Sequence, residues 1–213
     1  MGTYQSTSLW IASGNVAKAK ELIDLSVKYL SQSLSIVARQ PKDVVENEPT
    51  FQGNAKLKAH ALVRELIGEG QNNFAVLADD SGLCVDLLGG NPGVYSGRYA
   101  GGGSNSQDNL QKVLRELNAL TADMKKRTAR YHCSLYLVRV YESQIVAEYS
   151  AEGIREGLIG KIPKGDNGYA YDSVFLDPQS QTSYGEISYE EKQTDSHRSR
   201  AFMKLQSLLE TSK

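Results

Sequence analysis

The sequence has few cysteines, and this excludes a scaffold stapled by disulfides. Its 213 residues include only two cysteines, Cys84 and Cys133, whereas small secreted scaffolds depend on several. Both lie in strand-like apolar patterns, so we expect two buried, reduced thiols rather than a disulfide or a redox pair. Neither is spaced from a histidine in the way that a zinc site requires.

The sequence also lacks an excess of charge of either sign and any long apolar run. Its 24 lysines and arginines against 25 aspartates and glutamates give a formal net charge of −1, which offers no general attraction to nucleic acid or to an anionic membrane. No segment approaches the ~20 apolar residues of a membrane span, and Met1–Ser8 has no apolar core of a secretory signal. We therefore expect a soluble, cytoplasmic protein that binds neither nucleic acid nor membrane.

Strand-like and helix-like patterns alternate through the first half of the chain. Short apolar runs predict strands, and apolar residues at every third or fourth position predict helices. The predicted strands are Leu9–Ala12, Leu34–Ala38 and Phe74–Ala78, and the predicted helices are Asn15–Leu30 and Gly53–Ile67.

A glycine-rich connection, residues 89–103, separates this half from a ribbon-like second half. After it we expect a helix over Asp108–Leu117 and a half-buried strand over Ala129–Val140. The next segment, Ile145–Ile159, predicts one or two strands broken around its two glycines, which together with the preceding strand form an antiparallel ribbon. A short strand near Ser173–Leu176 and a closing helix capped by Ser196 complete the chain.

These patterns predict a mixed α/β fold built on one long sheet. A chain of 213 residues suffices for one well-packed domain and is short for two. We therefore expect a single domain over residues 1–213, with two α/β lobes that are not independent. A cleft between the lobes is the expected binding site.

An acidic pair, Asp79-Asp80, follows the buried run that ends at Ala78 and precedes a further predicted strand, Leu83–Leu87. Adjacent carboxylates repel unless a cation or strong donors neutralise them, and a strand end with such a pair suits Mg²⁺ and a phosphate substrate. Asp80 would then bind the metal and accept a proton from an attacking water. A simple turn is the alternative, because Asp, Ser and Gly all favour turns.

A second acidic candidate lies in the polar loop between residues 41 and 51. Glu46 is a reasonable further metal ligand there, and Glu48 is the alternative.

The segment Ser13-Gly14-Asn15 lies between a predicted strand and a predicted helix, with Lys18 one turn further on. Such a junction presents backbone N–H groups to an anion at the positive end of the helix dipole, and Lys18 would reach the same anion. The spacing is not that of a Walker A loop. An ordinary helix cap followed by a solvated lysine would have the same sequence.

Two segments of the last quarter carry groups suited to a nucleotide. Lys192, His197 and Arg198 supply donors, and an arginine suits a phosphate or a carbonyl oxygen on a base; His197 at a helix start also suits a structural hydrogen bond. Tyr169 offers a face for base stacking, and Asp172 can accept from a ring N–H. Tyrosines are frequent in this chain, so plain packing would also explain this aromatic segment.

In this order the segments resemble the inosine triphosphate pyrophosphatase family, whose members hydrolyse ITP, XTP and their deoxy forms to the monophosphate and pyrophosphate. The resemblance extends from about Ile11 to Leu209. The motifs that carry it are Ser13-Gly14-Asn15 with Lys18, Phe51 with Asn54-Ala55, Ala78–Leu83, Gly90–Ser96 with Arg98-Tyr99, Asn109-Leu110 and Ser196-His197-Arg198.

The resemblance implies a role for each candidate residue. Residues 13–18 would hold the triphosphate, with Lys18 as its cation. Asp80 would be the general base and a metal ligand, with Glu46 in the metal's shell and Asp79 adjacent. The remaining substrate contacts would come from Ser81, from Tyr169 stacked on the base, from Asp172 at the base or ribose, and from Lys192, His197 and Arg198 closing over the base.

The resemblance also implies a fold, a cofactor and an assembly. It predicts a long mixed sheet with two α/β lobes around a nucleotide-binding cleft, a requirement for Mg²⁺, and a homodimer. The function that it implies is the hydrolysis of deaminated purine nucleoside triphosphates, which cleanses the nucleotide pool.

One segment departs from the family's pattern Gly-Phe-Gly-Tyr/Trp-Asp-Pro, because residues 168–173 read Gly-Tyr-Ala-Tyr-Asp-Ser. Ala170 adopts a positive φ less readily than glycine, and Ser173 lacks the rigidity of proline. This leaves two alternatives, a pyrophosphatase of altered base specificity and a nucleotide-binding protein without turnover. A Maf-like pyrophosphatase would begin with Ala-Ser-x-Ser-Pro-Arg-Arg, which this chain lacks.

Overall fold

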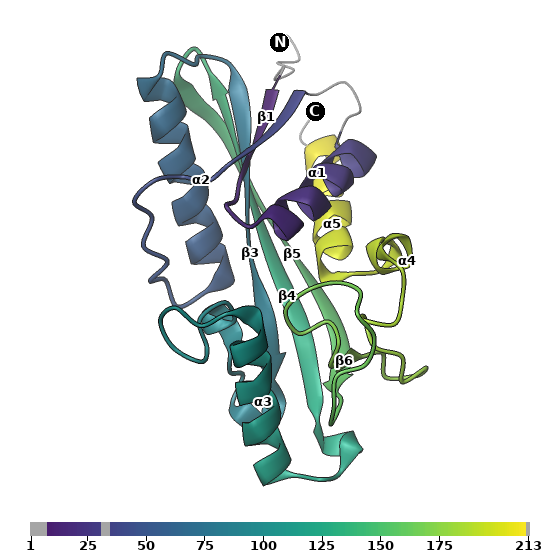
Figure 1. The fold of residues 1–213 in the computed structure, drawn as a ribbon. Helices are drawn as coiled ribbons and strands as arrows, with labels where there is room; N and C mark the ends of the chain where they lie inside the picture. The colour runs from purple at the N-terminus through teal and green to yellow at the C-terminus, as the bar shows by residue number, and fades with distance from the viewer. Residues whose placement is uncertain (1–7, 31–34, 212–213) are drawn as a thin grey trace. The chain divides into compact units, whose positions relative to one another are not determined.

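The computed structural model describes residues 8–30 and 35–211, which form a six-stranded mixed sheet with helices (Figure 1). The strand order is β2-β1-β3-β4-β5-β6. This is the α/β class that the sequence predicted. The strands are β1 Ser8–Ala12, β2 Ser35–Arg39, β3 Phe74–Val85, β4 Thr128–Tyr141, β5 Gln144–Ile159 and β6 Phe175–Leu176. The α-helices are α1 Val16–Tyr29, α2 Phe51–Gly68, α3 Ser106–Leu120, α4 Tyr189–Thr194 and α5 His197–Thr211.

Most predicted elements are confirmed to within a few residues, and three expectations need correction. The predicted break after Ala78 is wrong, because β3 continues through the acidic pair to Val85. The break expected within Ile145–Ile159 is also wrong, because β5 is one continuous strand. The short helix α4 was not predicted, and Leu34 lies outside the described residues.

Gly157, one of the two glycines at which the break was expected, serves packing. A Cβ at Gly157 would clash with the ring of Phe175. A glycine within a strand often marks such a close approach. Gly157 therefore lets an aromatic ring pack against β5 and does not interrupt it.

The chain divides into two compact units. The first contains Met1–Asp80, Cys133–Gly153 and Arg198–Lys213, and the second contains Ser81–His132 and Ile154–His197. The chain passes from one unit to the other within β3, β4 and β5 and at the start of α5.

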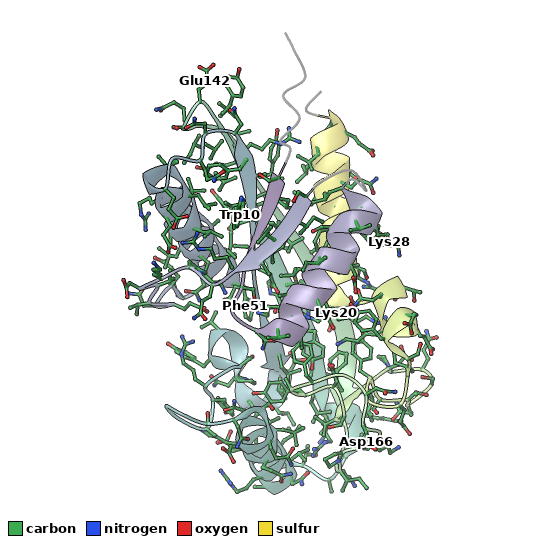
Figure 2. The ribbon with its side chains drawn as sticks, turned by 45° about the horizontal axis from the view of Figure 1, so that its top comes forward. Trp10, Lys20, Lys28, Phe51, Glu142 and Asp166 are labelled. Atoms are coloured by element: carbon green, nitrogen blue, oxygen red, sulfur yellow. The ribbon has the colours of Figure 1, made fainter. Side chains whose placement is uncertain are left out.

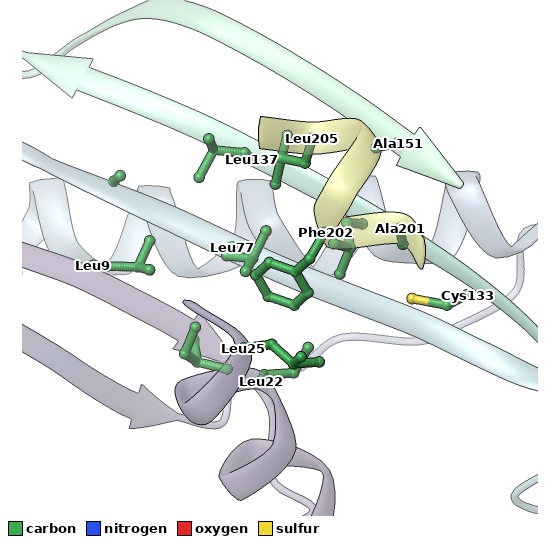
Figure 3. Packing of buried hydrophobic residues seen from close by; sticks show 13 residues of the cluster. Leu9, Leu22, Leu25, Leu77, Cys133, Leu137, Ala151, Ala201, Phe202 and Leu205 are labelled. Atoms are coloured by element: carbon green, nitrogen blue, oxygen red, sulfur yellow. The ribbon is translucent and has the colours of Figure 1, made fainter. Parts of the chain in front are cut away.

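The first unit has a core on each face of its part of the sheet. On one face α1 and α5 pack against β1 and β3, and Figure 3 shows Phe202 of α5 pointing toward Leu77 of β3. On the other face α2 packs through Leu62 against Val76. Lys20 and Lys28 lie on the exposed surface of α1 (Figure 2). Because neighbouring strand residues face opposite sides, alternate residues of β3 enter one core or the other.

The strands β2, β1 and β3 are parallel, and their register fixes where the acidic pair lies. Ala12, the last residue of β1, pairs with Arg39 of β2 and with Ala78 of β3. β1 then turns into α1, whereas β3 runs on through Asp79 and Asp80. The acidic pair therefore lies immediately beyond the carboxyl end of β1, the edge at which open α/β sheets bind their ligands.

The second unit packs α3 and the far ends of the long strands around aromatic side chains. Helix α3 begins with a capping box in which Asn105 and Asp108 bond each other's backbone. Its apolar side joins a cluster that includes Leu83, Tyr131 and Phe175. Both cysteines are free, as expected; Cys133 is buried, but Cys84 is only half-buried. Within the described ranges, no helix has the length and apolarity needed to cross a bilayer.

A fully buried arginine, Arg127, joins three segments of this second unit. Its Nε donates to the carbonyl of Ile159 at 2.7 Å and its Nη2 to that of Gly160 at 2.9 Å. Its Nη1 donates to the carbonyl of Thr121, which follows α3, at 3.2 Å. One planar guanidinium thus satisfies backbone groups of two loops and a strand end.

We expect Arg127→Met to lower the free energy of unfolding by about 3 kcal/mol, because buried carbonyls left without donors each cost roughly 1–3 kcal/mol. Urea unfolding followed by circular dichroism would measure the change. The half-exposed Arg130, which pairs with Asp86 and Glu156, gives the matched control Arg130→Met. A similar small loss in both variants would contradict a structural role for Arg127.

Candidate functional site

The two adjacent aspartates face opposite sides of β3. Asp79 shares a face with Leu77, whose cluster contains α1 and α5, and Asp80 shares the other face with Ala78, whose cluster contains α2. Each carboxylate therefore meets cations from different helices. This arrangement explains how a strand can continue through two neighbouring acids.

Asp79 is held by two cations and a thiol. Lys18 Nζ lies 3.5 Å from its Oδ2, Arg198 Nε donates to the same oxygen at 3.1 Å, and Cys133 Sγ donates to Oδ1 at 3.6 Å. Arg198 also donates through Nη1 to Glu21 of α1 at 2.5 Å. Burial by itself raises the pKa of Asp79, but Lys18 and Arg198 outweigh it and hold that pKa well below its usual range. Asp79 is thus a fixed negative charge.

Asp80 has a different environment and a pKa shifted in the opposite direction. Lys58 Nζ donates to its Oδ1 and Asn54 Nδ2 to its Oδ2, both at 3.2 Å. Burial raises the pKa of Asp80, and the neighbouring carboxylates of Glu46 and Asp79 add to this effect, so that the attraction of Lys58 is outweighed. Neighbouring carboxyl groups with diverging pKa values divide their roles, and the more basic one is suited to accept a proton.

The loop before α2 brings Glu46, rather than Glu48, to this acid. Glu46 Oε1 lies 3.3 Å from Lys58 Nζ, so Lys58 lies between Glu46 and Asp80. Glu48 instead uses its backbone: its N–H donates to Asn54 Oδ1 at 3.0 Å, and its carbonyl accepts from Asn54 Nδ2 at 3.3 Å. Asn54, which is fully buried, therefore bonds both Asp80 and the loop that contains Glu48, and it holds both against α2.

These carboxylates fit a magnesium site that is completed by a substrate. Asp80 and Glu46 both approach one cationic position, which Lys58 occupies. No group of three or more acidic, histidine or cysteine side chains that could hold a metal occurs among residues 8–30 and 35–211. Mg²⁺ typically takes one or two carboxylates and completes its shell with phosphates and water, so two carboxylates are an adequate protein contribution.

The amino-terminal loop combines a helix cap with a paired lysine. Asn15 is the N-cap of α1, and its side chain accepts from the backbone N–H of Lys18 at 3.0 Å. The alternative of a solvated lysine is wrong, because the Lys18 side chain is only 16% exposed and approaches Asp79. Ser13 Oγ accepts from the N–H of Asn15, and the side chain of Gln40 lies against Gly14. The loop is therefore tightly built at the positive end of α1.

In the second unit, Asp172 is the centre of the candidate residues. Its Oδ2 accepts from Lys192 Nζ at 2.7 Å and from the backbone N–H of Tyr169 at 2.9 Å. Its Oδ1 accepts from the hydroxyl of Tyr131 at 3.0 Å. Lys192 Nζ also lies 5.1 Å from the centre of the Tyr169 ring. A Cβ at Gly168, where φ is +76°, would clash with the Asp172 carboxylate, so this glycine permits the close approach.

The structure brings the sequence-predicted residues together in two groups. In the first unit the group is Ser13, Gly14, Asn15, Lys18, Glu46, Asp79, Asp80 and Arg198, and in the second unit it is Tyr169, Asp172, Lys192 and His197. Ser81 follows Asp80 in β3 and is half-buried. The roles assigned to all these residues stay predictions.

Sequence reasoning missed Lys58, Glu21 and Tyr131 and gave Asn54 no role. Asn54 and Lys58 are four residues apart on α2 and therefore share a face of the helix, beside the apolar residues that cover the sheet. Glu21 is likewise one turn from Lys18. For Asn54, Lys58 and Glu21, the signal available in the sequence was a polar residue on the side of a helix that is otherwise apolar and faces the sheet.

The fold and the first unit's residues define an α/β protein with a carboxylate-and-cation site at the carboxyl end of parallel strands. The model of the Ham1 family matches residues 9–208. This chain belongs to the Ham1 family, and the family-level resemblance seen in the sequence is confirmed.

Similar proteins span nearly the whole chain. The dITP/XTP pyrophosphatase of Geobacillus kaustophilus is 40% identical over 92% of this chain and 90% of its own length. That of Clostridium perfringens is 38% identical, over 92% and 93%. Among solved structures, a HAM1 protein from Coxiella burnetii has a TM-score of 0.78 and 32% identity, covering 96% of this chain and 98% of its own. The Staphylococcus aureus Ham1 protein has a TM-score of 0.76 and 31% identity, covering 97% and 100%.

Proposed function

We propose that this chain is a nucleoside triphosphate pyrophosphatase that hydrolyses deaminated purine nucleoside triphosphates. ITP, dITP and XTP would be cleaved to the monophosphate and pyrophosphate. The observation that carries the proposal is the acidic pair with diverging pKa values, surrounded by Lys18, Lys58 and Arg198 at the ligand-binding edge of the sheet. Relatives that cover most of the chain are named dITP/XTP pyrophosphatases.

In this proposal the first unit carries the hydrolysis. Asp80 accepts a proton from the water that cleaves the α–β phosphoanhydride, and Asn54 and Lys58 hold its two oxygens in place. Lys18 and the backbone N–H groups at the start of α1 bind the triphosphate, with Ser13, Gly14 and Asn15 forming the loop. Asp79 keeps Lys18 and Arg198 in position.

Magnesium is the cofactor that we propose, with Asp80 and Glu46 as its protein ligands. When bound, the metal would neutralise negative charge on the phosphates. In the structure Lys58 Nζ lies within 3.3 Å of both carboxylates. Burial by itself lowers the pKa of Lys58, but Asp80 and Glu46 outweigh it and raise that pKa, so the lysine stays charged and holds the two ligands near one another.

We expect Glu46→Gln to raise the Mg²⁺ concentration that gives half-maximal pyrophosphate release by roughly tenfold, because losing a carboxylate ligand weakens a metal site by at least as much as losing its supporting contacts. Titration of Mg²⁺ at saturating dITP would measure this shift. Glu48→Gln is the matched control, because Glu48 contacts Asn54 through its backbone. Equal shifts in the two variants would contradict the assignment of Glu46.

The second unit would contact the base. We propose that Tyr169 stacks on the purine, that Asp172 accepts from its ring N–H, and that Lys192 and His197 complete the contact. Hypoxanthine and xanthine carry the acceptor O6 where adenine carries an N–H₂ donor. A protein donor facing O6 would be left unpaired by adenine, at a cost of roughly 1–3 kcal/mol, or about tenfold to a hundredfold in discrimination.

Two further residues keep a proposed part in substrate binding. Ser81, next to Asp80, would contact the substrate. Arg198 was predicted to close over the base, and this stays a prediction. In the structure its Nε and Nη1 donate to Asp79 and Glu21.

The assembly expected from the family and the location expected from the composition also stay predictions. We propose a homodimer acting in the cytoplasm, and a single domain over residues 1–213. Size-exclusion chromatography with light scattering would establish the oligomeric state.

A nucleotide panel tests the proposal. Pyrophosphate release with Mg²⁺ would be measured for ITP, dITP, XTP, GTP, ATP, dTTP, UTP and CTP. We expect kcat/KM for ITP, dITP and XTP to exceed that for ATP by about tenfold to a hundredfold. Preference for another base would indicate that the altered Tyr169 segment has changed specificity. Nucleotide binding without turnover would favour a binding protein.

A further inference from the structure

Tyr131 is a buried tyrosine of β4 that contacts two of the residues proposed to bind the base. It is 6% exposed, and its hydroxyl donates to Asp172 Oδ1 at 3.0 Å. Its ring stacks on the imidazole of His197, with centroids 4.7 Å apart and planes at 15°. Tyr131 therefore links an acid and an imidazole that lie 25 residues apart in the sequence.

The hydroxyl of Tyr131 is one of three donors that orient the Asp172 carboxylate, and it is the donor on Oδ1. A carboxylate offers about four accepting positions, two on each oxygen. At Asp172, Lys192 and the backbone N–H of Tyr169 take two positions on Oδ2, and Tyr131 takes one on Oδ1. Only the second position of Oδ1 is then left to accept from a ligand, and the Tyr131 hydroxyl fixes its direction.

The surroundings of Tyr131 keep it a neutral donor with a fixed ring. Burial raises the pKa of Tyr131 well above its usual value, and the charge of Asp172 raises it further. Its ring is also 4.4 Å from that of Phe175 and 6.1 Å from that of Tyr184, centroid to centroid. The Tyr131 hydroxyl is therefore held in place as a donor to Asp172 Oδ1.

We propose that Tyr131 is a positioning residue for base recognition: it fixes the Asp172 carboxylate so that one accepting position of Oδ1 is presented to the N–H of a 6-oxo purine. Adenine carries an acceptor at that ring position, so its ring nitrogen and the Asp172 carboxylate would be two acceptors facing each other without a proton between them. The proposal rests on the proposed function, since it assigns Tyr131 to the base contact made by Asp172.

The test compares two tyrosines of the same aromatic cluster. Tyr131→Phe removes the hydroxyl that bonds Asp172 and keeps the ring. Tyr184→Phe is the matched control, because Tyr184 packs against the rings of Tyr131 and Phe175, whereas the tyrosine hydroxyl that bonds Asp172 is that of Tyr131. Kinetics with dITP, thermal unfolding, and calorimetric binding of dITP without Mg²⁺ would be measured for both variants and for the wild type.

We expect Tyr131→Phe to raise KM for dITP, and to weaken its binding, by about tenfold relative to Tyr184→Phe, as for the loss of a hydrogen bond to a charged group. Its kcat should stay within about twofold, because the base contact is made equally before and during the reaction. In an Asp172→Asn background, Tyr131→Phe should add less than about twofold, because the tyrosine acts through that carboxylate.

Three results would overturn the proposal: equal KM and binding in the two Phe variants, an undiminished effect of Tyr131→Phe in the Asp172→Asn background, or a fall in kcat with KM unchanged. A lower unfolding temperature with unchanged binding would likewise assign Tyr131 to structure alone. If the wild type binds dITP without hydrolysing it, the proposed hydrolysis fails and the binding arm still decides the role of Tyr131. If the wild type does not bind dITP, both proposals fail.

Discussion

Asp80→Asn is expected to lower kcat for dITP by roughly 10²- to 10⁴-fold, the range associated with a positioned general base. The amide has the shape of the carboxylate, so Asn54 keeps its neighbour, but it cannot take a proton from water. Lys58 retains Glu46 as a counter-ion 3.3 Å away, so the variant should fold. Steady-state pyrophosphate release, with circular dichroism as a check on folding, measures the effect.

The control for this experiment is an aspartate outside the site. Asp24 pairs with Lys20 at 2.7 Å on the exposed side of α1, and Asp24→Asn should leave kcat unchanged, since exposed pairs contribute little. If Asp80→Asn retained the turnover of Asp24→Asn, Asp80 would not be the base.

Arg198→Met is expected to lower the free energy of unfolding by about 3–5 kcal/mol, the cost of removing one member of a buried ion-pair network. Arg198 is 3% exposed and bonds two carboxylates, Asp79 and Glu21, that are themselves buried. Asp79 keeps Lys18 nearby, whereas Glu21 loses the guanidinium that lies 2.5 Å away. Denaturant unfolding would measure the loss.

Two further variants separate this effect from a general loss of arginine. Arg39 also bonds two carboxylates, those of Glu65 and Glu69, but near the surface, so Arg39→Met should cost less than about 1 kcal/mol. Adding Glu21→Gln to Arg198→Met should recover part of the stability, because it removes the buried charge that Arg198 Nη1 neutralises in the wild type. Equal losses in Arg198→Met and Arg39→Met, or no recovery in the double variant, would contradict a buried ion-pair network.

Local patterns predicted the elements of the fold well and the continuity of the long strands poorly. Periodicity found α1 and α2 because their apolar faces cover the sheet. The predicted β3 ended too early, because two aspartates and a nearby glycine are typical of a turn when the cations that pair with the aspartates are not known from the sequence. The cations that neutralise Asp79 and Asp80 come from α1, α2 and α5, and their approach is a property of the tertiary structure.

The same reason explains which candidate residues the sequence revealed. Motif residues such as Asn15, Lys18 and Asp80 are recognisable because each has a local signature at a strand end or helix start. Lys58 and Tyr131 have no such signature, because each lies inside a regular element. Lys58 bonds Asp80, 22 residues away in the sequence, and Tyr131 bonds Asp172, 41 residues away. Only the fold places those groups in contact.

The altered aromatic segment is a case in which the fold overrides the sequence. Ala170 stands where the resemblance led us to expect a glycine, and it adopts a φ of +56°. The left-handed conformation costs an alanine roughly 1–2 kcal/mol. The chain therefore keeps a backbone turn that brings Tyr169 next to Asp172. Asp172 Oδ2 accepts hydrogen bonds from Lys192 Nζ and from the backbone N–H of Tyr169.

The most direct test of the central claim is the identity of the products formed from dITP and Mg²⁺, separated by ion-exchange chromatography. The proposed function predicts dIMP and pyrophosphate in equal amounts, with little product from dATP under the same conditions. Release of dIDP and inorganic phosphate would contradict cleavage of the α–β bond, and equal hydrolysis of dATP would contradict recognition of the deaminated base.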